Sequence, residues 1–286
     1  MKRLLPAFLA LGFILTSFSS FGQIRNYTTQ QAPLPCLNKE FSVVLHTVVD
    51  SFGMTNIEQA NIDAAFADLN AAFEPICASF TICEERTIKN FQYDQLDSLE
   101  QWEEILISEH QPNRINVFLV FNTILGQESP AEEAGLATQN GIQSLETGGI
   151  VAHKRDIDAG SKTLTHLFGH YFGLIHTFEG NGAELVDGSN CTTEGDLICD
   201  TPADNFVPNT GGPFDGGYLN PDPNIMCRYI DASDLDDNDE PYRPDVGNFM
   251  SYYFDITVPV DCRCGFSYEQ YNLMAKNYLD SSPKMW

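Results

Sequence analysis

Positive charge is scarce in this sequence. Across 286 residues, 15 Lys and Arg stand against 40 Asp and Glu, and the formal net charge is -25. A field of this sign repels phosphate backbones and anionic lipid headgroups. We therefore expect neither nucleic acid nor a membrane among the partners, and we expect a monomer.

Long apolar runs are absent beyond the N-terminus. Residues 1–22 combine a basic start, an apolar stretch and small residues, which is the layout of a cleaved secretory signal. That stretch is too short for a membrane span, and no later segment approaches about 18 uninterrupted apolar residues. We expect an exported protein with a polar, proline-bearing extension over residues 23–40.

Cysteine is present in an even number, eight, which in an exported chain favours disulfides over thiolate metal sites. A mixture of free and paired thiols is the alternative, and the pairing stays open. Cys36 could act as a metal-blocking switch, but a disulfide is the expected state in this compartment. Five cysteines are predicted to staple a long irregular segment: Cys191, Cys199, Cys227, Cys262 and Cys264.

The first two elements are strongly patterned. Residues 41–49 (FSVVLHTVV) are β-branched and apolar, as in a buried strand. Thr55 and Glu58 suggest a capping box, after which Ile62, Phe66 and further apolar residues mark one face of a helix that ends at Pro75.

The following elements alternate in type and predict a layered α/β unit over residues 41–176. Strands are expected at 78–83, 115–121 and 149–153, the last at a sheet edge, with a helix over 95–108. Residues 177–286 form a second unit in which Gly, Asp, Asn and Pro predominate until a final helix at 267–278.

Three of the six histidines are concentrated in one short segment: His166, His170 and His176. Residues i and i+4 share a helix face, so the first two can face one ion. Gly173 permits a left-handed turn that returns the chain and offers the third. Three neutral imidazoles with an open fourth position suit zinc; a helix of hydrogen-bonded core histidines is the alternative.

This segment, read from Thr163 to Phe178, resembles the motif of the pappalysin-like metzincins, zinc metallopeptidases that include ulilysin and cytophagalysin-type enzymes. Their pattern HExxHxxGxxH is matched at every element except Leu167. The likeness also covers Asn248–Tyr252, similar to the family's Met-turn, and Gly195–Pro202, similar to its GDxxxDTP segment. Phe266, Ser267, Gln270 and Met274 are similar to its closing helix.

The resemblance implies a metzincin-type catalytic domain of the α/β class. Its N-terminal part is a twisted sheet with two main helices, and its C-terminal subdomain is irregular, disulfide-containing and closed by a helix. Met250 would form a hydrophobic floor beneath the histidines. Tyr252 would stabilise an oxyanion near the metal, with ordinary core packing as the alternative.

Calcium is a second cofactor that the resemblance implies, in the segment after the zinc helix. Asp196, Asp200 and Thr201 are its candidate ligands. The acidic run from Asp231 to Asp245 does not fit an EF-hand loop, because Asp239 stands where that loop requires glycine.

A general base is missing from the histidine segment. In the family the motif glutamate takes a proton from the attacking water, but Leu167 stands at that position and no Asp or Glu lies between Thr163 and His176. Loss of such a group costs about 10²- to 10⁴-fold in rate. The sequence predicts a pseudopeptidase that binds a peptide or protein ligand in its cleft, by strand addition along Gly149–His153. One alternative is an active metalloendopeptidase with another base, and a second is a structural protein that keeps the scaffold and leaves the site empty.

Overall fold

The computed structural model describes residues 32–123, 135–144, 147–180, 182–206, 227, 229, 234–252, 254–255, 260–282 and 284. The expected secretory signal at 1–22 lies outside these residues, as does the first half of the 23–40 extension, residues 23–31. Within the described part of the chain, no helix has the length and apolar character to cross a membrane. The division between residues 176 and 177 stays a prediction.

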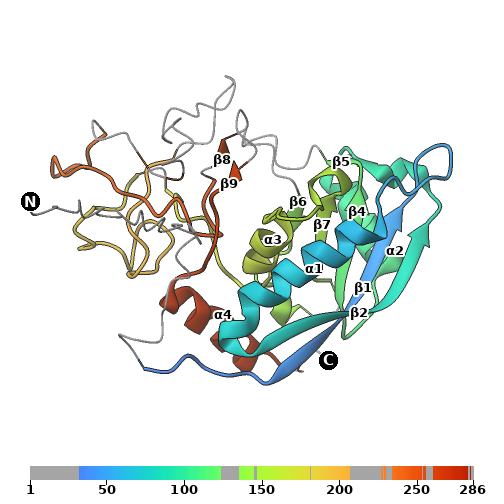
Figure 1. Cartoon of the computed structure of the whole chain (residues 1–286), viewed down its shortest axis with the longest axis horizontal. Helices are drawn as coiled ribbons and strands as arrows, with labels where there is room; N and C mark the ends of the chain where they lie inside the picture. The colour runs from blue at the N-terminus through green and yellow to red at the C-terminus, as the bar shows by residue number, and fades with distance from the viewer. Residues whose placement is uncertain are drawn as a thin grey trace, which may run out of the picture.

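A five-stranded sheet forms the first half of the molecule (Figure 1). Its strand order is β2-β1-β4-β7-β6, with parallel pairing throughout except for antiparallel β6 on β7. The strands are β1 (Lys39–Val48), β2 (Ala78–Ile88), β4 (Ile115–Val120), β6 (Gly135–Ala137) and β7 (Gly149–His153).

Central strands β4 and β7 are buried along their whole length, which explains their continuous apolar runs. The strand predicted at 149–153 is confirmed, but its predicted place at an edge is wrong. β7 pairs with β4 on one side and with β6 on the other, so β6 is the outer strand of the described sheet.

Helices cover both faces of this sheet. α1 (Gln59–Phe73) and α3 (Thr163–Tyr171) share one large core with the sheet, whereas α2 (Leu99–Glu109) packs its Trp102 against a second, smaller core on the other face. α1 begins after Glu58 without any side-chain cap, so the predicted capping box at Thr55 is wrong. Burial of its apolar face, rather than capping, stabilises this helix.

The second half is irregular as predicted. After α3 the described residues contain only two further strands, β8 (Phe254–Asp255) and β9 (Val260–Asp261), before the closing helix α4 (Tyr268–Asp280). In Figure 1 this half lies on the opposite side of α3 from the sheet. The remaining short elements are β3 (Gln95–Leu96), β5 (Asn122–Thr123) and 3-10 turns at Glu74–Ile76, Phe91–Asp94, Gly141–Gln143 and Lys154–Asp156.

Three disulfides are present: Cys36–Cys77, Cys191–Cys199 and Cys227–Cys262. The last two lie in the irregular half and confirm that it is stapled. The first fixes the chain before β1 to the turn that enters β2, so the disulfide rather than the metal-switch interpretation holds for Cys36. Cys264 was also predicted to staple this segment, but it is exposed and lies outside the three disulfides. Its backbone N–H donates to the Gly247 carbonyl over 2.8 Å.

Candidate metal centre

Helix α3 and the turn after it bring the three histidines together. His166 and His170 lie one turn apart on α3, and Gly173 has a φ of +100°, in the left-handed region that glycine adopts without strain. A Cβ at Gly173 would also stand 2.2 Å from Nδ2 of Asn277 on α4. The positive φ favours glycine at this turn, and the turn returns the chain so that His176 faces the helix.

The three Nε2 atoms converge on one point. His170 Nε2 lies 3.0 Å from His166 Nε2 and 3.1 Å from His176 Nε2. A tetrahedral ion with metal–nitrogen bonds of about 2.0–2.1 Å would separate its ligand atoms by about 3.3 Å, close to these spacings. Among the described residues, this is the one group of three or more candidate ligand side chains whose donor atoms gather in this way.

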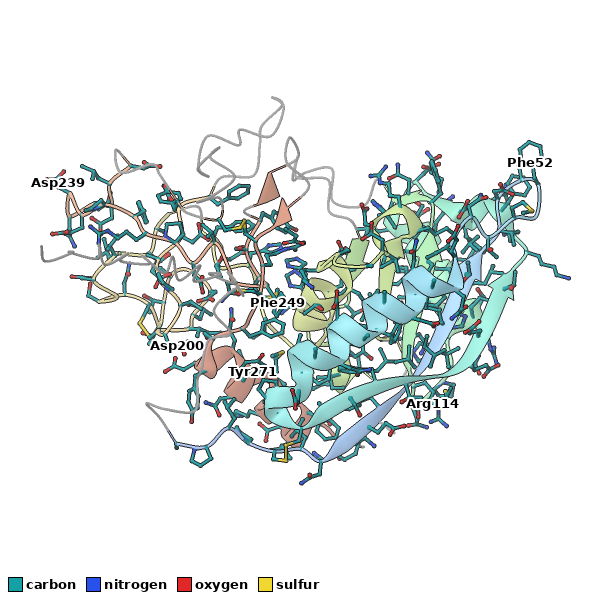
Figure 2. All side chains as sticks on the ribbon, viewed as in Figure 1. Phe52, Arg114, Asp200, Asp239, Phe249 and Tyr271 are labelled. Carbon is teal, nitrogen blue, oxygen red and sulfur yellow. A yellow bond between two sulfur atoms is a disulfide. The ribbon has the colours of Figure 1, made fainter. Side chains whose placement is uncertain are left out.

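The opposite ring nitrogens fix the rings in the orientation that a metal needs. His166 Nδ1 lies 2.7 Å from the Phe249 carbonyl, and His170 Nδ1 lies 2.8 Å from the Leu174 carbonyl. A carbonyl only accepts, so each Nδ1 carries the proton and each Nε2 keeps a free lone pair. Figure 2 shows Phe249 beside α3, at the junction of the two halves.

Electrostatics keep these rings neutral. Burial lowers the pKa of His170 to about 4 and the pKa of His166 and His176 well below the ordinary value. Repulsion between the rings and the positive charge of Arg263 add to the effect on His166 and His176. Neutral imidazole is the form that binds metal, so the donor set suits a divalent cation.

The floor of the site is the segment that resembles a Met-turn. Met250 is fully buried, and a Cβ at Gly169 of α3 would stand 2.4 Å from the Met250 sulfur, so the helix rests directly on this residue. The Tyr252 ring is 4.7 Å from the His176 ring and 5.3 Å from the His166 ring. Its role as an oxyanion stabiliser stays a prediction, because Phe178 and Phe206 also pack against it.

Leu167 belongs to the large core. Its side chain is 3% exposed. A Cβ added to Gly135 of β6 would stand 2.7 Å from Leu167 Cδ1, so this strand passes close to the leucine. The position next to the first histidine is therefore apolar and closely covered by the outer strand.

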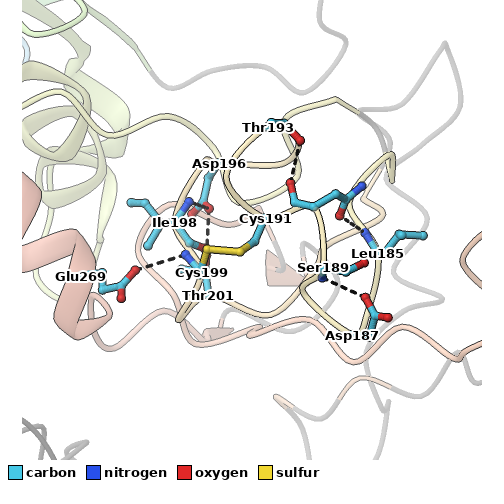
Figure 3. The surroundings of a disulfide bond; sticks show 11 residues. Leu185, Asp187, Ser189, Cys191, Thr193, Asp196, Ile198, Cys199, Thr201 and Glu269 are labelled. Carbon is cyan, nitrogen blue, oxygen red and sulfur yellow. Dashed lines mark hydrogen bonds between the residues drawn. A yellow bond between two sulfur atoms is a disulfide. The ribbon is translucent and has the colours of Figure 1, made fainter.

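The candidate calcium ligands differ in their hydrogen-bond partners. Asp196 and Thr201 bond to each other, with Thr201 Oγ1 donating to Asp196 Oδ1 over 2.8 Å (Figure 3). Asp200 instead turns toward α4, where its carboxylate accepts from Ser267 Oγ and from the Glu269 backbone N–H. These bonds join segments distant in sequence, so the sequence pattern does not reveal them.

Two charged residues near the candidate site were not predicted from the sequence. Glu184 is buried beside Gly195, where a Cβ would stand 2.1 Å from its Oε2, and burial together with the charges of Asp196 and Asp204 raises its pKa to about 7. Arg263 forms a two-point ion pair with Asp261 and acts on the metal-site histidines. Neither lies in a spacing that marks a site, so no sequence signal identifies them.

Part of this chain is similar to known proteins. Residues 133–229 match the family model described as pregnancy-associated plasma protein-A. An extracellular metalloprotease of Colletotrichum graminicola is 35% identical over 95 residues, covering 32% of this chain and 30% of that protein. Extracellular metalloprotease 1 of Coccidioides posadasii is 36% identical over 76 residues, covering 25% and 24%. The matched segment is thus under a third of either relative's length.

A solved structure extends the likeness to the whole fold. Mature mirolysin of Tannerella forsythia, in complex with a cleaved peptide, superposes with a TM-score of 0.54 at 16% identity, covering 86% of this chain and 93% of that chain. The sheet, the three-histidine site and the methionine floor are thus arranged as in a metzincin-type fold. Residues 133–229 of this chain are similar to the pappalysin-like family, as the sequence motif indicated.

Proposed function

We propose that this protein is an exported zinc-binding pseudopeptidase that holds peptide segments without cleaving them efficiently. Leu167 is the observation that carries the proposal. The residue that would move a proton is replaced by one buried in the core, while the metal donor set is complete. Export is supported by the N-terminal sequence pattern and by relatives named as extracellular metalloproteases.

Three neutral histidines would hold the zinc, and their Nδ1 bonds to backbone carbonyls would keep them aligned. Zinc at such a donor set acts as a Lewis acid that polarises a carbonyl oxygen. Leu167 has no atom that accepts a proton and excludes water from its side of the site. The chain can thus orient a carbonyl group but lacks, at this position, the group that activates a nucleophile.

The peptide would pair with the outer strand of the sheet. Strand addition needs unpaired backbone groups at an edge, and β7 offers none because β4 and β6 flank it. β6, whose Gly135 lies over Leu167 of α3, supplies that edge next to the histidines. The proposed binding strand is therefore Gly135–Ala137 rather than Gly149–His153.

Calcium near Asp196 completes the proposal. Asp196 is 3% exposed, its Oδ2 has no hydrogen-bond partner among the described residues, and burial raises its pKa to about 7. Glu184 is also 3% exposed, and burial together with the charge of Asp196 raises its pKa to about 7. A hard cation with oxygen ligands would neutralise both carboxylates.

Metal content and turnover test the function together. We expect purified protein to carry about one zinc per chain and to cleave an unfolded protein substrate far more slowly than ordinary metallopeptidases do. His170→Ala should remove the metal and leave the sheet folded, because His170 is half-buried and lies outside the apolar core. No zinc even after its addition would refute the metal site. Ordinary peptidase rates in the wild type would favour the alternative, an active enzyme with another base.

A further inference from the structure

The Met-turn is connected to the closing helix through buried side chains. Asn248 is fully buried, and its Nδ2 donates to Oε1 of Gln270 on α4 over 2.9 Å. Its Oδ1 accepts the backbone N–H of Met250 over 2.9 Å. The second bond settles which end of the Asn248 amide is oxygen, because a backbone N–H needs an acceptor.

The peptide group between Phe249 and Met250 transmits this connection to the metal site. Its N–H is the one that Asn248 Oδ1 accepts, and its carbonyl is the one that lies 2.7 Å from His166 Nδ1. A peptide group is planar and trans, so holding the N–H on one side sets the direction of the C=O on the other. The orientation of His166 therefore depends on the Asn248 side chain.

Gln270 is suited to hold Asn248 because it acts here only as an acceptor. Its Oε1 receives both the Asn248 amide and, over 2.8 Å, the backbone N–H of Ser267 at the start of α4. Its Nε2 has no hydrogen-bond partner among the described residues. Gln270 is fully buried, so water cannot replace it.

We propose that Gln270 is a positioning residue of the metal centre, which aligns His166 through Asn248 and the Phe249 carbonyl. This inference rests on the metal site proposed above. Loss of the acceptor leaves two buried donors unsatisfied, frees the Asn248 side chain and releases the peptide group that orients His166. Outer partners of metal-bound histidines typically contribute about 10- to 100-fold in metal affinity.

Gln270→Met tests the proposal, because methionine has similar length and no acceptor oxygen of comparable strength. Tyr271→Phe is the matched control: it removes the bond from the Tyr271 hydroxyl to the Ala72 carbonyl, from the same helix, without touching the Met-turn. Figure 2 shows Tyr271 on α4 beside α1. We expect Gln270→Met to weaken zinc binding about 10- to 100-fold and to change the visible absorption of the Co²⁺-loaded protein. Tyr271→Phe should alter neither.

A measurement without metal separates this inference from the proposed function. In the metal-free wild type, NMR should show a slowly exchanging Nδ1 proton of His166, which Gln270→Met loses and Tyr271→Phe keeps. Suppose that the wild type binds zinc and that Gln270→Met has the same zinc affinity, cobalt spectrum and Nδ1 signal. That result would overturn the role of Gln270 and leave the metal site standing. A wild type that binds no zinc would overturn the proposed metal site, and the Nδ1 signal would then decide whether Gln270 orients His166.

Wild-type hydrogen exchange decides the matter if Gln270→Met does not fold. Coupling is reciprocal, so zinc should slow exchange of the Ser267 amide, which donates to Gln270. The Ser281 amide, which donates to the Tyr278 carbonyl at the far end of α4, should not change. Equal response of the two amides would overturn the proposal.

Discussion

Leu167 directly follows the first metal-site histidine and packs beneath Gly135, so it belongs to both the site and the core. A carboxylate at this position would lose solvation among apolar neighbours, and its pKa would rise. A nearby cation offsets that cost. The residue thus affects folding and chemistry through the same property, its lack of charge.

Leu167→Glu should raise peptide hydrolysis by about 10²-fold or more in zinc-loaded protein, because it restores a proton acceptor. The rise should disappear with a chelator or in combination with His170→Ala. Turnover of an unfolded protein substrate, measured with and without zinc, checks the prediction.

Leu167→Gln is the control for this substitution, since glutamine has the same shape as glutamate but no basic carboxylate. It should remain as slow as the wild type. A folded, zinc-loaded Leu167→Glu protein with no more activity than Leu167→Gln would mean that the site has diverged beyond its missing base, which favours peptide binding as its role.

The segment from Gly182 to Phe206 contains neither helix nor strand, and it buries carboxyl groups. Leu197 has a φ of +63°, a left-handed conformation that is rare for a branched side chain, and it lies directly after Asp196. Burial holds the pKa of Asp196 and Glu184 at about 7, against 3.8 and 4.5 for the exposed groups. Without a cation, this segment destabilises the fold at neutral pH.

The pH dependence of stability follows from these raised pKa values. Between about pH 4.5 and 7 the folded state keeps protons on Asp196 and Glu184 that the unfolded chain has released. The free energy of unfolding therefore falls as pH rises through this window. Glu184→Gln should therefore gain stability relative to calcium-free wild type as pH rises through this window. Calcium at pH 7 should raise the wild-type melting temperature more than that of Glu184→Gln.

The stability of the wild type must be compared with that of Glu184→Gln, because His46 changes the pH dependence of stability in the opposite direction. Burial lowers its pKa to about 4, so its contribution increases with pH over part of the same window. Parallel stability curves for wild type and Glu184→Gln across the pH range, or an equal response to calcium, would contradict the prediction.

Helices and strands with long apolar patterns could be predicted from the sequence. Very short strands, and contacts between segments distant in sequence, could not. The strand expected at 41–49 is β1, and the helix facing the core with Ile62 and Phe66 is α1. β6 has only three residues, too few for a periodic signal, and its presence moves β7 from the edge to the interior.

The candidate metal centre was predictable because its ligands are close in sequence. One helical turn and one glycine determine how His166, His170 and His176 meet. The partners that orient them are distant: Phe249 lies 83 residues from His166, and Asp200 bonds to Ser267 at a separation of 67. Such pairs depend on how the two halves pack, and no local pattern encodes that packing.

At the scale of the whole molecule, disulfides support both halves. Cys191–Cys199 and Cys227–Cys262 lie in the irregular half, which has little regular secondary structure to stabilise it. Cys36–Cys77 closes a loop with a sequence separation of 41 around β1 and α1. A cross-link over a loop of that length restricts the unfolded chain substantially.

Replacing Cys36 and Cys77 together by alanine should lower the free energy of unfolding by about 4 kcal/mol. The melting temperature should fall by roughly 10 °C. Cys83→Ser is the control, because Cys83 is exposed on the neighbouring strand and lies outside the three disulfides. Calorimetry on both variants checks this; equal melting temperatures would show that the cross-link adds nothing to the sheet.

The same disulfide also determines how the sheet responds to pulling. β1 and β2 are parallel, begin at the same end and pair from Lys39 with Ala78 to Val48 with Ile88. Tension applied to the chain before Cys36 enters both strands together through the disulfide, so these two strands move as one body. The load is then carried by the shorter β1–β4 ladder and by the packing of α1. Under reducing conditions β1 alone would take the force and shear against both neighbours, which makes the mechanical strength of this protein sensitive to redox conditions.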